Sequence, residues 1–230
     1  MSSGPISNYA IDLVFVIDIT GSMGKVIEEV KKLVVGFIDQ LREAMANKGK
    51  GLQDLQVRVI TFRDLGVEGR GAITASSFFE LPHQAVELRD FVARLAPAGG
   101  GTEPESGREA LWTAMRSPWR NVLRSRHVVV MLTDASAHPL GMFEYPSDLF
   151  QDAVPPPASL NELKKQWGVG TKSGVMNSQA RRLVLFAPTA TPWNEIGEHW
   201  ENVTWLPSEA GSGCDKADLE VILGQIAQSV

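Results

Sequence analysis

Short apolar runs alternate with longer amphipathic stretches along most of this sequence. Four runs are rich in β-branched residues and are bounded by polar, glycine or proline residues: Leu13–Ile17, Val57–Phe62, Val128–Leu132 and Leu183–Phe186. Such runs are typical of strands that are buried on both faces of a sheet. Shorter strands are predicted at Ile73–Leu81, on an edge of the sheet, and at Val203–Leu206.

Helical periodicity fills most of the intervals between these strands. Between Lys25 and Met45 apolar residues recur at the spacing of one helix face, and the pattern ends in the helix-stopping segment NKGKG. Further helices are predicted at Ala85–Leu95, Glu105–Met115, Leu160–Trp167 and Lys216–Ile226. Because strand and helix alternate, the sequence predicts the α/β class, with a mostly parallel sheet and helices on both faces.

One alternating pattern runs through most of the 230 residues, so we interpret residues 1–230 as a single domain with its core at about residues 10–228. The stretch at about residues 139–180 breaks the rhythm. It contains the pair Tyr145-Pro146, the triple proline Pro155–Pro157 and several aromatic residues. This composition predicts an irregular excursion from the sheet.

Composition and charge narrow the class of protein. With 43% hydrophobic and 21% charged residues, the chain is expected to bury a substantial core. It has neither a signal-like N-terminus nor the roughly 20 consecutive apolar residues of a membrane span. A net charge of −5 provides no general attraction for nucleic acid or an anionic membrane, and the one cysteine, Cys214, cannot form an internal disulfide. We therefore expect a cytoplasmic protein that binds neither nucleic acid nor membrane.

The segment IDITGSMG follows the first apolar run and places three oxygen-bearing side chains at alternate positions, Asp18, Thr20 and Ser22. In an open α/β sheet, ligands bind beyond the carboxyl ends of the strands, where such a segment lies. A phosphate-binding Walker loop requires four residues between its first glycine and its Gly-Lys pair. Gly21 and the Gly24-Lys25 pair are separated by only two, which excludes that loop.

Hard oxygen donors of this kind instead suit a divalent ion, Mg²⁺ or alternatively Mn²⁺ or Ca²⁺. Three donors do not fill an octahedral shell, so other loops at the same edge should contribute. Asp134 stands at the end of the strand Val128–Leu132, and Thr102 follows the flexible turn Gly99–Gly101. The sequence therefore predicts a metal site formed by Asp18, Thr20, Ser22, Thr102 and Asp134.

With these residues in this order, the chain resembles the von Willebrand factor A domain family and its metal-ion-dependent adhesion site. That site is written Asp-x-Ser/Thr-x-Ser, then a Thr after a glycine-rich turn, then an Asp at a later strand end. The segments DLVFVIDITGSMG, VRVITFRDLG, GGGTEPESGREAL and VVVMLTDASAHP follow family order and extend the resemblance over about residues 10–135. It implies a Rossmann-like fold whose mostly parallel sheet has one short antiparallel edge strand.

The resemblance is closer to the intracellular and bacterial branch than to integrin-type domains. Members of that branch often carry Phe/Tyr-Arg-Asp after the second strand and Gly-Gly-Gly-Asp-x-Pro-Glu before the third helix. Here the second motif has Thr102 in place of its Asp, followed by Glu103. This departure leaves both Thr102 and Glu103 as residues that can face the metal, and we favour the Thr102 hydroxyl.

The resemblance implies a binding module and not an enzyme. Hydroxyl groups would bind the ion directly, while Asp18 and Asp134 act through water, so that the ion accepts an Asp or Glu side chain of a partner protein. Relatives of this branch imply an adaptor or assembly factor in an intracellular, bacterial system related to stress or defence. The partner implied is an AAA+ ATPase, a kinase or a phosphatase of the same system.

Two alternatives differ in what the metal does. A Mg²⁺-dependent phosphohydrolase of the haloacid dehalogenase type would use Asp18 as its nucleophile, but it needs a second aspartate two residues on, where this chain has Thr20. A structural subunit would use the metal only to stabilise its loops.

Overall fold

The structure is a computed structural model, and it describes residues 7–25, 27–146, 148–150, 154–171 and 174–208. Two features of the sequence lie outside these residues, namely Cys214 and the helix predicted at Lys216–Ile226. In the described ranges, no helix has the length and apolar character that crossing a membrane requires.

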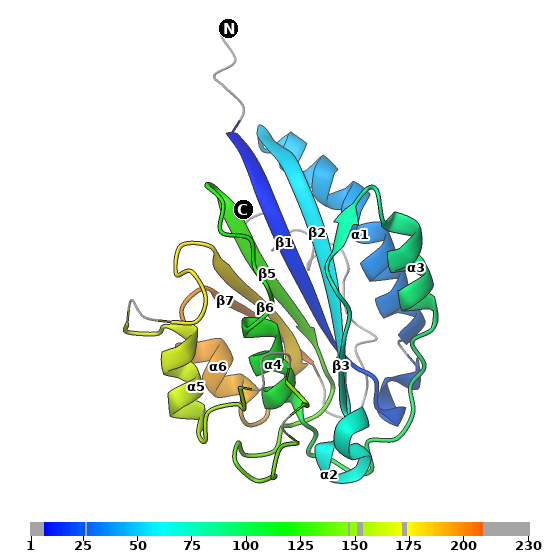
Figure 1. The fold of residues 1–230 in the computed structure, drawn as a ribbon, viewed down its shortest axis with the longest axis vertical. Helices are drawn as coiled ribbons and strands as arrows, with labels where there is room; N and C mark the ends of the chain where they lie inside the picture. Colours follow the sequence, from blue (N-terminus) through cyan, green and yellow to red (C-terminus); the bar gives the residue numbers. More distant parts are fainter. Residues whose placement is uncertain (1–6, 26, 147, 151–153, 172–173, 209–230) are drawn as a thin grey trace, which may run out of the picture.

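The strands form a single sheet in the order β3-β2-β1-β5-β6-β7, with β4 also paired to β2 (Figure 1). Their bounds are β1 Ser7–Asp18, β2 Lys50–Phe62, β3 Ile73–Ala75, β4 Phe79–Leu81, β5 Ser125–Leu132, β6 Arg181–Pro188 and β7 Val203–Ser208. All pairs among β2, β1, β5, β6 and β7 are parallel, and β3 and β4 run antiparallel to β2. The predicted α/β fold with a mostly parallel sheet and an antiparallel edge is confirmed.

The antiparallel edge is divided into two short strands because Ser76 interrupts it. Ser76 N donates to Val59 O at 2.9 Å, while Ser76 Oγ accepts a hydrogen bond from Val59 N at 3.0 Å. A side-chain oxygen thus takes the place of a backbone carbonyl at this point of the ladder. The single strand expected at Ile73–Leu81 is therefore observed as β3 and β4.

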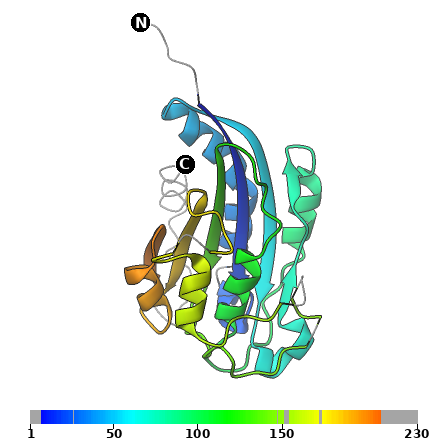
Figure 2. The ribbon, with the colours of Figure 1, turned by 60° about the vertical axis from the view of Figure 1, so that its left-hand side comes forward.

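Helices cover both faces of the sheet, as the sequence predicts. Their bounds are α1 Ile27–Asn47, α2 Leu65–Glu68, α3 Ala85–Ala93, α4 Gly107–Met115, α5 Leu160–Trp167 and α6 Trp193–His199, with 3₁₀ turns η1 Gly21–Lys25 and η2 Gly69–Gly71. Helices α1 and α3 lie on one face, and α4, α5 and α6 lie on the other (Figures 1 and 2). Helix α6 was not expected, because it has only seven residues, too few to show a helical period.

The side chains of strand β1 are buried alternately in the two apolar cores, one on each face of the sheet. Ile11, Leu13 and Phe15 belong to the apolar core on the α1 side, whereas Val14 and Val16 belong to the core on the α4 side. All five side chains are fully buried. Burial of each such side chain contributes about 1.5–3 kcal/mol, so consecutive apolar residues in a central strand stabilise two layers at once.

The irregular stretch after β5 is packed onto α4, whose residues are all buried. Tyr145 Oη donates to Glu109 Oε1 at 2.9 Å, and Trp112 Nε1 donates to Val154 O at 3.0 Å. Helix α5 then begins after the N-cap Ser159, whose side chain accepts a hydrogen bond from Glu162 N. The excursion predicted at about residues 139–180 thus leaves the sheet but contributes side chains to its second core.

Glu109 provides a test of this packing through the pH dependence of stability. Burial raises the pKa of Glu109 to about 7, although the Tyr145 hydrogen bond opposes this. Between pH 4.5 and 7 the folded state therefore binds a proton that the unfolded state releases, and stability falls as the pH rises. We expect Glu109→Gln to match the wild type near pH 4.5 and to be up to about 3 kcal/mol more stable at pH 8.

Urea unfolding at several pH values measures this difference. The exposed Glu87→Gln in α3 is the matched control, and its stability should follow that of the wild type. Parallel pH curves for wild type and Glu109→Gln would contradict the expectation.

Candidate metal centre

Three neighbouring strands end at the same edge of the sheet, which lies at the bottom of Figure 1. β1 ends at Asp18, β5 leads into Thr133 and Asp134, and β2 ends at Phe62. Backbone hydrogen bonds continue past the strand ends, because Ile19 N donates to Phe62 O at 3.0 Å. This register brings the loops that follow the three strands together, as expected at the carboxyl edge of a parallel sheet.

Side-chain contacts join four of the five predicted metal ligands. Thr20 Oγ1 donates to Asp18 Oδ1 at 2.6 Å, and Thr20 Oγ1 and Ser22 Oγ lie 3.2 Å apart. Ser22 Oγ donates to Asp134 Oδ1 at 3.0 Å, which connects β1 to β5 across 112 residues of sequence. The structure therefore places Asp18, Thr20, Ser22 and Asp134 in one cluster.

Asp18 is the buried carboxylate that the hydroxyl groups around it contact. Its Oδ1 also accepts a hydrogen bond from Thr20 N at 2.9 Å, and its Oδ2 accepts one from Thr133 Oγ1 at 2.7 Å. The carboxylate is fully buried, so both of its oxygens are directed at hydroxyl groups and backbone, and not at solvent. Thr133 was not among the predicted site residues. Its place in the sequence, directly before Asp134, is the feature that could have identified it.

The segment after Asp18 forms a 3₁₀ turn, η1. Met23 N donates to Thr20 O at 3.2 Å at the start of η1, and α1 begins only at Ile27. This compact turn keeps the Thr20 side chain almost fully buried and leaves Ser22 exposed. Ser22 is therefore the member of the cluster that solvent or a partner can reach.

Thr102 lies beyond the glycine turn, which packs against Thr20. Gly100 has φ +88°, and a Cβ at this position would lie 2.4 Å from Thr20 Cγ2 and 2.7 Å from Glu105 Oε1. Only glycine tolerates both the conformation and the close approach. Thr102 itself is exposed and, within the described residues, makes no hydrogen bond to the other four predicted ligands.

Glu103, the alternative to Thr102, is held by the loop after β5. Its Oε2 accepts hydrogen bonds from Ser136 N at 3.2 Å and from Ser136 Oγ at 3.1 Å. The carboxylate is thereby held by Ser136, on the exposed side of that loop. The choice between Thr102 and Glu103 as the residue that faces a metal stays a prediction.

Glu105 is a candidate site residue that the sequence reasoning missed. Its side chain is only 4% exposed, and its Oε2 has no hydrogen-bond partner among the described residues. The backbone fixes it at the strand ends, because Glu105 N donates to Ser136 O at 3.0 Å and His138 N donates to Glu105 O at 2.9 Å. Its Oε1 lies beside Gly100 and Thr20. The one available signal was the family-like segment GGGTEPE, in which Glu105 follows a proline.

The carboxylates of this edge concentrate negative charge. Burial raises the pKa of Glu105 to about 9, and the nearby charges of Asp18, Asp64 and Asp134 act in the same direction. Burial also raises the pKa of Asp18 to about 6, against the hydrogen bonds from Thr20 and Thr133. A bound divalent cation would lower these pKa values, because it stabilises the ionised carboxylates. The donor set and the unpartnered Glu105 oxygen therefore fit such an ion.

Hydroxyl groups are essential to this fit. In the part of the chain that the structure describes, no three His, Cys, Asp or Glu side chains form a metal-binding group by themselves. Asp64, at the end of β2, serves the local fold, since its Oδ1 caps α2 through Gly66 N at 2.8 Å and lies 3.2 Å from His138 Nε2. Asp64 thus supports the edge without joining the hydrogen-bonded cluster.

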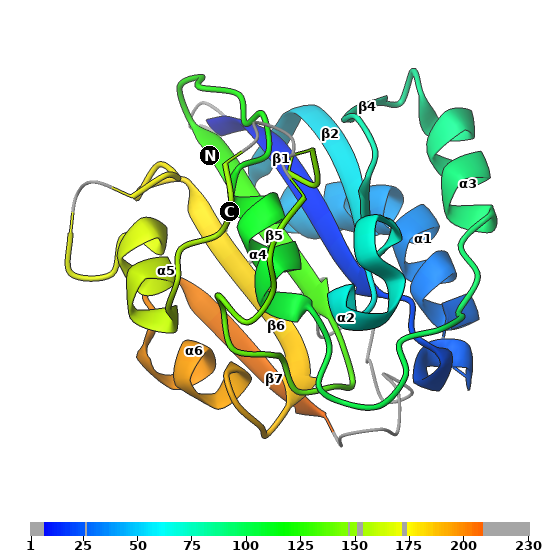
Figure 3. The same cartoon turned by 60° about the horizontal axis from the view of Figure 1, so that its bottom comes forward.

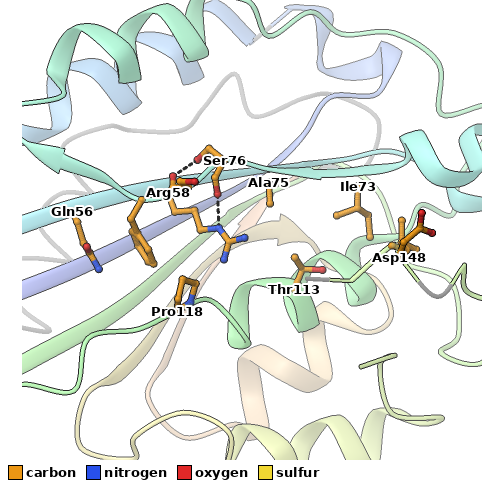
Figure 4. A pocket seen from close by; sticks show the side chains of 11 residues that line it. Gln56, Arg58, Ile73, Ala75, Ser76, Thr113, Pro118 and Asp148 are labelled. Carbon is orange, nitrogen blue, oxygen red and sulfur yellow. Dashed lines mark hydrogen bonds between the residues drawn. The ribbon is translucent and has the colours of Figure 1, made fainter. Parts of the chain in front are cut away.

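A cavity of about 520 Å³ lies elsewhere, beside the middle of β2 on the α4 side of the sheet. Figure 4 shows the buried Arg58 side chain in this cavity, where its Nε donates to Ser76 O at 2.9 Å. Arg58 pairs in register with Val14, four residues before the end of β1 at Asp18. The cavity is thus separate from the metal edge, and the functional argument rests on the edge.

Comparisons with known proteins agree with this fold. The profile of the von Willebrand factor type A domain matches residues 12–157. The alpha-protein kinase vwkA of Dictyostelium discoideum is 31% identical over 128 residues, which are 56% of this chain and 19% of that protein. The pilus adhesin SpaC of Lactobacillus rhamnosus GG, in an open conformation, matches with a TM-score of 0.55 at 12% identity over 95% of this chain and 30% of that chain.

A second SpaC structure gives a TM-score of 0.53 at 14% identity with the same coverage, and at such identities both adhesin structures show the fold alone. The chain spans less than a third of each of these relatives, so their whole activities do not transfer to it. The family profile, however, covers more than half of the chain. This chain therefore belongs to the von Willebrand factor type A domain family.

Proposed function

We propose that this protein is a metal-dependent interaction module that binds an acidic side chain of a partner protein. The observation that carries the proposal is the cluster of Asp18, Thr20, Ser22 and Asp134, in which each hydroxyl donates to a carboxylate and the two hydroxyl oxygens lie 3.2 Å apart, with the Glu105 carboxylate beside it. The family supports the same role, since its domains commonly serve in protein interaction and adhesion.

The residues of the edge divide into buried supports and exposed donors. The buried Asp18 accepts a hydrogen bond from the Thr20 hydroxyl, which leaves the lone pairs of that hydroxyl to face the ion, as outer groups do at other metal sites. Ser22 and Thr102 are exposed and would hold the ion at the surface. When bound, Mg²⁺ supplies a Lewis-acidic coordination position that an external carboxylate can fill.

The contacts of Asp18 weigh against the phosphohydrolase alternative. A nucleophilic carboxylate must present an oxygen to its substrate. Both Asp18 oxygens are instead engaged by Thr20 and Thr133, and the side chain is fully buried. We therefore propose a non-enzymatic role.

The proposed setting is a cytoplasmic, bacterial multi-protein system in which this chain acts as an adaptor or assembly factor. An AAA+ ATPase, a kinase or a phosphatase of that system is the proposed partner. The kinase named among the relatives is consistent with a domain that works alongside catalytic machinery, although the similarity covers only 19% of that protein.

A chelator-controlled pull-down tests this function. With the chain as bait, we expect a protein of the source cells to be retained in Mg²⁺ and released by EDTA. Asp134→Asn bait should not retain it, because the variant removes one charge from the buried cluster. The exposed Asp54→Asn, which lies near the start of β2, is the matched control and should retain it. Retention that ignores both EDTA and Asp134→Asn would place the interaction on another surface.

A further inference from the structure

One of the few well-exposed large apolar side chains, Val67, lies beside the metal edge, and another, Met142, belongs to a loop that packs on the helix of Val67. Val67 and Met142 are each 59% exposed. The other exposed large apolar side chains among the described residues are Val86, Val122, Leu123 and Val154. Exposed apolar side chains gathered beside a binding site commonly contribute to the contact with a partner.

Val67 lies directly against the loop that carries Thr102. A methyl group at Gly101 would lie 3.2 Å from Val67 Cγ2, so the valine covers the residue before Thr102. The next residue of α2, Glu68, accepts a hydrogen bond from Gly100 N at 3.3 Å through its Oε1. Helix α2 is therefore hydrogen-bonded to the glycine turn. Val67 is exposed to solvent near Thr102, a proposed metal ligand. Figure 3 brings this edge of the molecule forward.

Met142 belongs to the loop after β5, which packs on α2. A methyl group at Gly66 would lie 3.1 Å from Phe143 Cε1, so the residues next to Val67 and Met142 pack against each other. The Phe143 ring also contacts the His138 ring edge-on, with 5.0 Å between the ring centroids. His138 Nε2 in turn lies 3.2 Å from Asp64 Oδ1. The loop is thus packed on α2 through Phe143, and we call the exposed apolar side chains of these two segments, Val67 and Met142, the apolar rim.

The charges around the apolar rim restrict what can bind beside the ion. Glu103 is exposed at this edge, Glu68 is partly exposed beside Gly100, and Glu144 is exposed two residues after Met142. A partner segment with several acidic residues would meet these carboxylates with like charge. A single acidic residue can reach the ion, while its neighbours gain most by contacting Val67 and Met142.

We propose that the apolar rim selects partner segments in which one acidic residue is flanked by apolar side chains. This inference rests on the proposed function, because it assumes that the ion at the edge captures the acidic residue. It adds the identity of the flanking residues, which the metal site alone does not specify.

Fluorescence anisotropy with four labelled peptides tests the proposal. Each peptide carries one aspartate flanked on both sides by leucine, serine, lysine or glutamate. In Mg²⁺ we expect the leucine peptide to bind about tenfold more tightly than the serine peptide, which corresponds to about 1.4 kcal/mol. EDTA should abolish this binding.

The double variant Val67→Thr, Met142→Gln should reduce the leucine-to-serine ratio to near one while Mg²⁺ still supports binding. Val86→Thr is the matched control, since this valine is 61% exposed at the far start of α3, and it should keep the tenfold ratio. Equal binding of the leucine and serine peptides, or tightest binding of the lysine peptide, would overturn the inference and leave the proposed function in place. If no peptide binds in a Mg²⁺-dependent way, the proposed function is wrong, and the inference with it.

Discussion

Mg²⁺ is expected to raise the melting temperature of the wild-type protein by about 5–10 °C and that of Asp134→Asn by less than about 2 °C. An ion at a hundredfold excess over its dissociation constant contributes about 2.7 kcal/mol, and each kcal/mol raises the melting temperature by about 2–4 °C at this chain length. Asp134 is fully buried and accepts a hydrogen bond from Ser22 at 3.0 Å. Asparagine keeps its shape but removes the charge that attracts the ion.

Differential scanning fluorimetry in EDTA and in increasing Mg²⁺ measures both shifts. The Asp54→Asn variant changes the net charge by the same amount at an exposed position near the start of β2, and it should respond to Mg²⁺ as the wild type does. If Asp134→Asn keeps the full shift, the ion binds elsewhere and the predicted cluster is wrong. If neither protein responds, the edge does not bind Mg²⁺.

The fold could be predicted because its signals are local. Apolar runs such as Leu13–Ile17 mark the buried middle of a strand, and the helix predicted at Leu160–Trp167 has a serine cap before it and a glycine after it. The ends of the strands and the short elements could not be predicted from local sequence patterns. β1 extends back to Ser7 because pairing with β2 continues beyond the apolar run, and Ser76 splits the edge strand through a contact with Val59.

The candidate site could be predicted only in part. Asp18, Thr20 and Ser22 stand close in sequence, and Asp134 occupies the same position at the end of its own strand, so the four were found together. Glu105 was missed because its role depends on three-dimensional contacts. Its burial follows from backbone bonds to Ser136 and His138, residues that are more than 30 positions away. No spacing rule within the sequence conveys such a contact.

The structure separates Thr102 and Glu103 by a similar non-local contact. Ser136 binds the Glu103 carboxylate through both its backbone and its hydroxyl group. Neither residue type nor order distinguishes a carboxylate that is held by a neighbouring loop from one that is free to face an ion. The choice of Thr102 stays a prediction, and its test is a loss of Mg²⁺ affinity in Thr102→Ala that Glu103→Gln does not reproduce.

Glu105→Gln is expected to have two opposite effects, a more stable metal-free protein and a weaker affinity for Mg²⁺. The Glu105 side chain is 4% exposed, one of its oxygens lacks a partner among the described residues, and Asp18 and Asp134 add like charge nearby. Burial and this like charge disfavour the ionised carboxylate in the folded protein, so the neutral amide should raise the melting temperature in EDTA at neutral pH by about 2–6 °C. The same loss of negative charge should weaken Mg²⁺ binding about tenfold.

Thermal unfolding in EDTA and isothermal titration with Mg²⁺ measure the two effects separately. Glu103→Gln is the matched control, because it removes the same charge at an exposed position, two residues after the glycine turn Gly99–Gly101. It should change the melting temperature and the Mg²⁺ affinity less than Glu105→Gln does. A merely structural role for Glu105 predicts a different pair of results, lower stability in EDTA with unchanged Mg²⁺ affinity. The combination of higher stability and weaker binding distinguishes a carboxylate that is kept for the ion, since the fold alone gains nothing from burying its charge.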